Sequence, residues 1–154
     1  MEETKQIKID KTDKDIINTL LDNSRLSYRQ IAKKINKSAA TVMNRVKKLE
    51  DSGIIKKYTA NIDYEKIGYE FPVMIDLRIS KGEEINSGYG IAKSPNVCAI
   101  YDITGAFDLS VTALFKTRKQ LDEFIKRLPK QNNVERSHTR LIINTLKEEN
   151  IKIT

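Results

Sequence analysis

Residues 27–53 read SYRQIAKKINKSAATVMNRVKKLEDSG, and this stretch predicts two short helices joined by a tight turn. Ser27 and Gln30 have the spacing of a capping box, in which each side chain bonds to the other residue's backbone N–H, so we expect a helix to begin here. After the turn, Ser38 can cap a second helix, and Gly53 is placed to end it. The arrangement is typical of a helix-turn-helix.

Apolar residues recur along both helices at three- and four-residue steps, which gathers them on one face of each helix. They are Ile31, Ala32 and Ile35 in the first helix and Val42, Val46 and Leu49 in the second. A further helix is predicted before this pair, because Thr12 with Asp15 forms a capping signature ahead of another apolar stripe. That stripe comprises Ile16, Ile17, Leu20 and Leu21. Three such helices can enclose a small core.

Positive charge is concentrated in the same region. Ten Lys or Arg residues lie between Arg25 and Lys57, against the two acidic residues Glu50 and Asp51. The formal net charge of the chain is +7, and fourteen basic and eight acidic residues lie up to Ala60, whereas fourteen and thirteen follow. A strongly basic helical surface attracts a polyanion. The partner that we infer is duplex DNA.

The helix after the turn is the predicted recognition helix, because in a three-helix unit of this kind it enters the major groove and reaches base edges. The predicted base-edge residues are Lys37, Ala39, Ala40, Met43 and Asn44. Ser38 and Thr41, at the start of this helix, complete the DNA-contacting set together with the predicted phosphate contacts Arg29, Arg45, Lys47 and Lys48. The alternative interpretation is a charged helix face that is merely solvated.

The pattern changes from helical to extended after Gly53. Residues 54–62 predict a strand that leads out of the DNA-binding unit, and Gly68, shortly before Pro72, is typical of a linker that ends where a strand begins. We therefore expect a DNA-binding domain at residues 1–60, a linker at 61–70 and a second domain at 71–154.

The second domain is predicted to alternate strands and helices. The expected elements are a strand at Phe71–Ile79, a helix at Glu83–Lys93 weakened by Gly88 and Gly90, strands at Val97–Thr104 and Phe107–Phe115 joined by a tight turn at Gly105 and Ala106, a helix from Thr117 to before Pro129, and a strand at Val134–Leu146. This βαββαβ order predicts a ferredoxin-like α+β sandwich in which both helices cover one face of the sheet. The other face of the sheet is left open, and dimerisation through it is the simplest way to cover it.

Cysteine usage and hydropathy indicate the compartment. The single cysteine, Cys98, excludes an intramolecular disulfide and is typical of a reducing environment, and its apolar neighbours predict a buried thiol. No apolar run approaches the about twenty residues that a membrane-spanning helix needs, and the polar N-terminus does not resemble a signal peptide. We expect a cytoplasmic protein that does not bind membranes.

Residues for catalysis or metal binding are lacking in the sequence. One histidine and one cysteine cannot build a zinc cluster, and there is no P-loop and no grouping of nucleophile, histidine and carboxylate. His138 is therefore expected to be an ordinary strand residue. We expect no metal, no cofactor and no enzymatic activity.

The helix-turn-helix and the following domain resemble the Lrp/AsnC (feast/famine) family of transcriptional regulators over nearly the whole chain. The family's pattern at the end of the helix-turn-helix stands here as Ser38, Thr41, Val42, Arg45, Val46, Leu49, Glu50, Gly53, Ile54 and Ile55. Residues 9–17, 23–27 and 104–108 are also similar to it. The resemblance implies a winged helix-turn-helix followed by the family's ACT-like (RAM) domain, a homodimer built through the sheets, and assembly of dimers into tetramers or octamers.

The resemblance also implies an amino-acid effector bound where hairpins of neighbouring dimers meet. The predicted effector-binding residues are Thr104, Gly105, Ala106, Phe107 and Asp108 in the hairpin, with Ser137 and Thr139 added from the last strand. A turn at Gly105 can offer backbone N–H groups to a carboxylate, and Asp108 can accept an ammonium group. The alternative is that Gly105 only permits the turn and Asp108 only caps the hairpin.

The predicted function is a sequence-specific DNA-binding transcriptional regulator that responds to an amino acid or related metabolite. One alternative is an architectural protein, which would bind DNA with a steep salt dependence and little sequence preference. The other is an amino-acid-sensing interaction module whose helix-turn-helix docks on protein, which would bind DNA weakly at any sequence.

Overall fold

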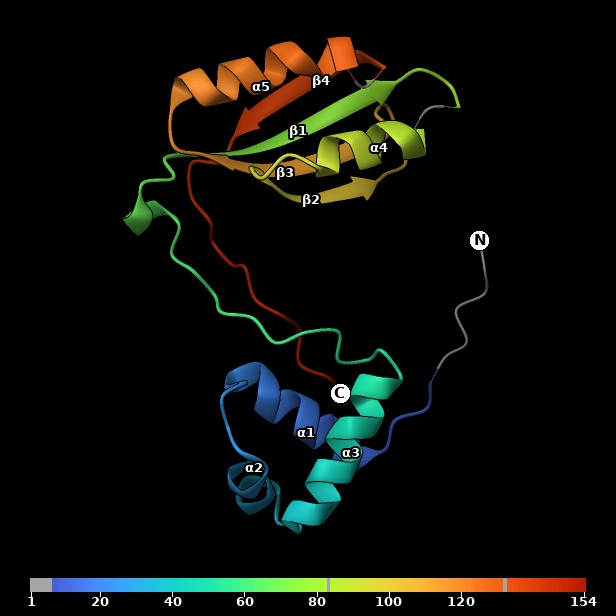
Figure 1. Cartoon of the computed structure of the whole chain (residues 1–154), viewed down its shortest axis with the longest axis vertical. Helices are drawn as coiled ribbons and strands as arrows, with labels where there is room; N and C mark the ends of the chain where they lie inside the picture. Colours follow the sequence, from blue (N-terminus) through green and yellow to red (C-terminus); the bar gives the residue numbers. More distant parts are fainter. Residues whose placement is uncertain (1–6, 83, 132) are drawn as a thin grey trace. The chain divides into compact units, whose positions relative to one another are not determined.

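The computed structural model describes residues 7–82, 84–131 and 133–154, which form two compact units (Figure 1). One unit comprises the described residues up to Asn61 together with Glu148–Thr154, and the other comprises Ile62–Lys147. The last seven residues, expected in the second domain, thus pack with the first unit. Among the described residues, no helix combines the length and hydrophobicity needed to cross a membrane.

The first unit contains three helices around one core. They are α1 (Lys11–Asp22), α2 (Tyr28–Ile35) and α3 (Ala39–Asp51). The buried residues of this core are Ile16, Ile31, Ala32, Val42, Val46 and Leu49, all of them members of the predicted apolar stripes. The predicted three-helix unit is therefore confirmed.

Local hydrogen bonds explain where these helices begin and end. The capping box of Ser27 and Gln30 is present, and Ser38 accepts a bond from the Thr41 N–H at 3.0 Å. Helix α2 ends at Ile35, and its C-cap Asn36 adopts a left-handed conformation with φ of 53°, which allows the tight turn. The cap predicted at Thr12 is wrong, because Asp10, two residues earlier, is the N-cap of α1 and forms a capping box with Asp13.

The strand predicted at residues 54–62 does not form. The chain from Lys56 to Asn61 is exposed and has no strand partner within the described part of the protein. A sequence pattern that favours extended backbone does not supply the second strand that a ladder needs. The segment is therefore extended chain.

The second unit has the predicted βαββαβ order, preceded by a short 3₁₀ helix at Glu65–Ile67. Its elements are β1 (Phe71–Ile79), α4 (Glu84–Ala92), β2 (Val97–Asp102), β3 (Leu109–Phe115), α5 (Arg118–Gln131) and β4 (Val134–Leu141). The strands form an antiparallel sheet in the order β2-β3-β1-β4, and α4 and α5 lie on the same face of it (Figure 1). The predicted ferredoxin-like α+β fold is confirmed.

Alternation along the strands separates a core face from an open face. Val73, Ile75 and Leu77 of β1 are fully buried against residues of α4 and α5. On the open face, the buried Asp76 accepts a bond from Ser110 Oγ at 2.9 Å and pairs with Arg140. The open face therefore presents a satisfied polar network beside its apolar residues.

In the second unit, five element boundaries and one burial state differ from the sequence prediction. Helix α4 ends at Ala92, one residue before the predicted Lys93, and Glu83, its predicted first residue, lies outside the described residues. Helix α5 passes through Pro129 and ends two residues later, since the proline removes one backbone donor only in the last turn. Strand β4 stops at Leu141, because the Ile142 N–H bonds to the Pro72 carbonyl at 2.8 Å and β1 begins at Phe71.

The remaining differences lie around β2. This strand ends at Asp102 and β3 begins at Leu109, so the connection is longer than the predicted tight turn at Gly105 and Ala106. The Cys98 thiol is exposed instead of buried. The register of β2 on β3 shifts between Val97 and Ala99, and this bulge takes Cys98 out of the regular alternation.

Candidate nucleic-acid interface and ligand site

The outer surface of α3 carries a continuous set of exposed side chains on the side opposite its buried residues. These are Ala40, Met43, Asn44, Lys47 and Lys48. Arg29 on α2 and Lys37 in the turn are exposed as well. A narrow row of small, apolar and amide side chains bordered by cations has the chemistry that base edges and phosphates require.

Three of the predicted DNA-contacting residues also make contacts within the unit at the start of α3. Ala39 is half-buried and packs against the core of the three helices. The hydroxyls of Ser38 and Thr41 lie 2.8 Å apart, and Ser38 also caps the helix. Their contacts within the unit orient α3.

Arg45 is held by two carboxylates at the start of α1. Its Nη1 atom lies 2.7 Å from Asp10 Oδ2 and 3.2 Å from Asp13 Oδ1. The two acids also cap each other, since each backbone N–H donates to the other side chain at 3.0 Å. The hydrogen bond to Asp10 is the main reason that the pKa of Arg45 is raised. Arg45 thus links α3 to α1, a role that its place in the helix pattern did not indicate.

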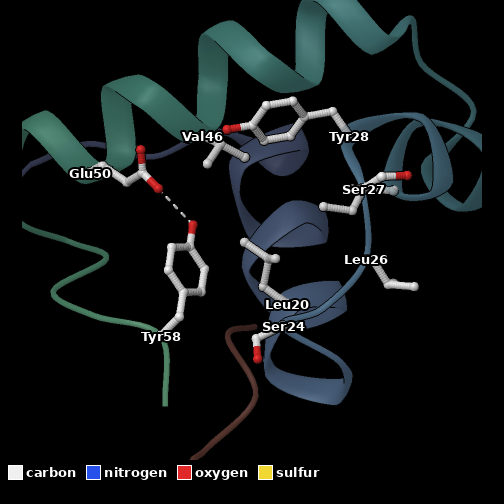
Figure 2. A pocket seen from close by; sticks show the side chains of 9 residues that line it. Leu20, Ser24, Leu26, Ser27, Tyr28, Val46, Glu50 and Tyr58 are labelled. Atoms are coloured by element: carbon white, nitrogen blue, oxygen red, sulfur yellow. Dashed lines mark hydrogen bonds between the residues drawn. The ribbon is translucent and has the colours of Figure 1, made fainter. Parts of the chain in front are cut away.

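A pocket of about 380 Å³ lies in the first unit, between the helices and the chain that follows α3. Its apolar wall includes Leu20, Ile31 and Val46. Figure 2 shows the Tyr58 hydroxyl directed at Glu50, to which it donates a bond at 2.8 Å. This bond anchors the start of the connecting chain to α3.

The Tyr58 bond predicts a titration at high pH. Burial, followed by the bond to Glu50, raises the pKa of Tyr58 from its ordinary value of 10.0 to about 12. A raised pKa stabilises the folded state fully below pH 10.0, and this contribution is lost as the pH rises to about 12. We expect Tyr58→Phe to remove a titration step near pH 12 and to make the loss of stability in this window shallower. Ultraviolet absorbance of tyrosinate measures the first effect and thermal unfolding the second.

Tyr101→Phe is the matched control, because Tyr101 is also exposed but lies on β2 of the other unit. This variant should keep the late titration step. A step near pH 12 that persists in Tyr58→Phe would contradict the assignment.

The loop between β2 and β3 carries the predicted effector residues. Ile103 N–H donates to the Asp108 carbonyl at 2.9 Å, which closes the loop, and Thr104, Gly105 and Ala106 are exposed at its tip. Gly105 has φ of +116°, and a Cβ at this position would have no atom within 4 Å. The tip is open, and its backbone requires glycine because of its conformation.

The Asp108 carboxylate already has partners in the protein. It accepts a bond from the Ile79 N–H at 2.8 Å and another from Arg78 Nη1 at 3.2 Å. Arg78 Nη1 also donates to the Ala106 carbonyl at 3.3 Å. Asp108 and Arg78 therefore hold the loop onto the end of β1, and sequence reasoning did not identify Arg78.

The last strand contacts this loop through a different residue from those predicted. Ser137 and Thr139 pair with Leu77 and Ile75, so they lie on the helix-covered face of the sheet. His138 faces the other way, and its ring stacks on Phe107 with centroids 6.2 Å apart. The structure thus brings Phe107 together with His138, and no pattern in the sequence pointed to this pair.

Two family models match the chain. The model described as winged helix-turn-helix DNA-binding matches residues 9–56, and the model described as Lrp/AsnC ligand binding domain matches residues 74–151. Among the described residues, no group of His, Cys, Asp or Glu side chains could hold a metal ion.

Individual relatives agree with these matches. An uncharacterized HTH-type transcriptional regulator of Pyrococcus furiosus is 38% identical over 144 residues, which cover 93% of this chain and 97% of the relative. The structure of B. subtilis LrpC is similar with a TM-score of 0.84 and 27% identity, and covers 93% of this chain and 100% of that one. A Neisseria meningitidis transcriptional regulator in complex with L-Met has the same fold, with a TM-score of 0.86, 23% identity, and coverage of 96% and 97%.

Proposed function

Because the chain belongs to the Lrp/AsnC family of transcriptional regulators, we propose that it binds specific sites on duplex DNA as a homodimer and that an amino acid controls this binding. The observation that carries the proposal is the exposed face of α3, where Asn44 and Met43 are bordered by Lys47 and Lys48. Two such helices in a symmetric dimer would read two half-sites of a palindromic sequence.

Exposed apolar residues support self-association. Ile143 and Leu146 follow β4 and are 86% and 97% exposed, and Ile62 and Ile67, which precede β1, are about half exposed. Apolar surface of this kind is typical of a protein–protein interface. This exposed apolar surface and the open face of the sheet both support a homodimer. We propose that the dimers assemble further into tetramers or octamers.

The loop at residues 103–108 is the proposed effector site. Its open tip at Gly105 leaves room for a carboxylate near the loop's backbone, and the stacked pair of Phe107 and His138 lies beside it. Asp108 is occupied by Arg78 and Ile79, so we propose that it shapes the site and does not itself bind the ammonium group. The L-Met complex of the Neisseria meningitidis regulator supports an amino acid as the ligand class.

We expect Gly105→Asp to abolish the effect of an amino acid on DNA binding while the dimer remains. The new carboxylate would repel the ligand's carboxylate at the loop tip, and the positive φ adds backbone strain of about 1 kcal/mol. L-Met is the first probe, followed by the other protein amino acids, with calorimetry and DNA titration as measurements.

Gly68→Asp is the matched control, since Gly68 also has a positive φ of +88° with no atom near an added Cβ, and it lies in the 3₁₀ turn. A response that survives in Gly105→Asp, or is lost equally in both variants, would remove the loop tip from the effector site.

Selection of duplexes from a randomised library, followed by titration of the selected duplex against random DNA, tests the proposed function as a whole. A specificity ratio of about a thousand or more, with a two-fold symmetric sequence, is expected. A ratio near one with a steep salt dependence would favour an architectural protein, and weak binding to all DNA would favour a module that docks on protein. The proposal includes a cytoplasmic location, where the DNA lies, and no catalytic activity.

A further inference from the structure

One face of α1 carries polar residues at four-residue steps. Lys14, Asn18 and Asp22 follow one another along successive turns and therefore form a stripe. The apolar residue Ile16 points into the core of the unit. The stripe is available to a segment outside the three helices, and residues 152–154 occupy it.

Asn18 binds the backbone of this segment with both ends of its side-chain amide. Its Nδ2 donates to the Ile153 carbonyl at 2.9 Å, and its Oδ1 accepts from the Ile153 N–H at 2.8 Å. This pair of bonds satisfies both the backbone N–H and the backbone carbonyl of Ile153, as a neighbouring β-strand would. These two bonds are partly buried and involve only the backbone of Ile153. They therefore hold residue 153 in place on α1 without requiring a particular side chain there.

The flanking contacts fix the direction of the segment. Lys152 pairs with Asp22 and also donates to the Asn18 carbonyl at 3.1 Å, and Lys14 Nζ donates to the Thr154 carbonyl at 2.5 Å. Three consecutive residues thus meet three successive turns of α1, and the segment runs opposite to the helix. The charged groups are exposed, so each flanking contact is weak and the segment can be released.

The chain leaves the DNA-binding unit after Asn61 and returns to it at Glu148. The second unit is therefore connected to the first at both ends, but the second connection holds only while residues 152–154 stay on α1. We propose that this segment is a releasable strap that restricts the rotation of the DNA-binding unit and so sets the spacing between the two recognition helices of a dimer. The inference rests on the proposed function as a dimeric DNA-binding protein.

Asn18→Ala in the full-length chain tests the strap, with Asn61→Ala as control because Asn61 is exposed outside α1. Hydrogen exchange of the Ile153 amide should become about tenfold faster or more in Asn18→Ala and stay unchanged in the control. DNA binding is then measured on the selected duplex and on duplexes with the half-sites moved apart or together. The wild type should discriminate among spacings, and Asn18→Ala should lose several-fold of that discrimination while keeping its affinity for a single half-site.

A charge exchange provides a second variant that does not depend on Asn18. Asp22→Lys should loosen the strap, and adding Lys152→Asp should restore both protection and spacing discrimination. Unchanged exchange in Asn18→Ala would overturn the strap, and faster exchange with unchanged spacing discrimination would overturn its role in DNA binding. If the wild type itself prefers no duplex, the proposed function fails, whereas the exchange result still reports on the strap.

Discussion

Replacement of Asn44 by alanine is expected to weaken binding to the preferred duplex by about 1–3 kcal/mol and to leave the affinity for random DNA unchanged. Asn44 is exposed in the second turn of α3, where a recognition helix faces base edges. Its side-chain amide can form a bidentate pair with adenine in the major groove. Because this pair exists only with the matching base, its loss lowers specificity and not general affinity.

Lys48→Ala is the contrasting variant, one helical turn further along α3. Lys48 is exposed and can contact a phosphate, so its loss should weaken binding to all duplexes alike and lower the salt slope by about one. Equilibrium titrations of both variants on the selected and random duplexes, at several salt concentrations, measure these effects. An equal loss on both duplexes in Asn44→Ala would show that Asn44 does not read bases.

Local patterns predicted most of the fold. The capping box at Ser27 and the spacing of Val42 and Val46 define helices from residues that are close in the sequence, and the structure has both. The predicted strand at Phe71–Ile79 is likewise present as β1, with Val73, Ile75 and Leu77 on its core face. Such signals succeed because the period of a helix or strand is a property of the local backbone.

The errors arose where a distant partner decides the outcome. Residues 54–62 have an extended pattern typical of a strand, but the described chain gives them no strand to pair with. Cys98 has the apolar neighbours of a core residue, yet it sits at a bulge on an edge strand. Neither the strand pairing nor the bulge can be predicted from the residues next to it in the sequence.

Contacts between residues that are distant in the sequence also account for the site residues that the sequence did not predict. Asn18 and Ile153 are far apart in the sequence, and so are Phe107 and His138, and only the folded chain brings each pair together. Arg45 fitted the charged margin of a recognition helix, and its binding to Asp10 required knowledge of how α1 crosses α3.

Asp13 and Arg45 connect helices α1 and α3, so the loss of either side chain should destabilise the first unit. Asp13→Ala is expected to lower the free energy of unfolding by about 1–3 kcal/mol, because Asp13 is only 4% exposed and accepts hydrogen bonds from the Asp10 N–H and from Arg45. Asp15→Ala is the matched control, since it removes the same charge from the same helix without breaking the capping box. Urea unfolding at neutral pH measures both, and an equal loss in the two variants would contradict the assignment.

Arg45→Ala separates the two roles that its position allows. If Arg45 links α1 to α3, the variant should lower stability while the salt slope of DNA binding stays at the wild-type value. If Arg45 contacts a phosphate, the slope should fall by about one, as in Lys48→Ala. The distances to Asp10 and Asp13 favour the first result.

Acid titration gives an independent measure of the same link. The Asp13 N–H and, to a smaller degree, Arg45 lower the pKa of Asp10 below its ordinary value of 3.8. A lowered pKa contributes stability that is fully present above pH 3.8 and is lost as the pH falls through the lower value of the folded state. Arg45→Ala should therefore make the acid loss of stability shallower. An Arg45→Ala protein that is destabilised at neutral pH but keeps the wild-type acid profile would show that the side-chain stem, and not the ion pair, holds α1 to α3.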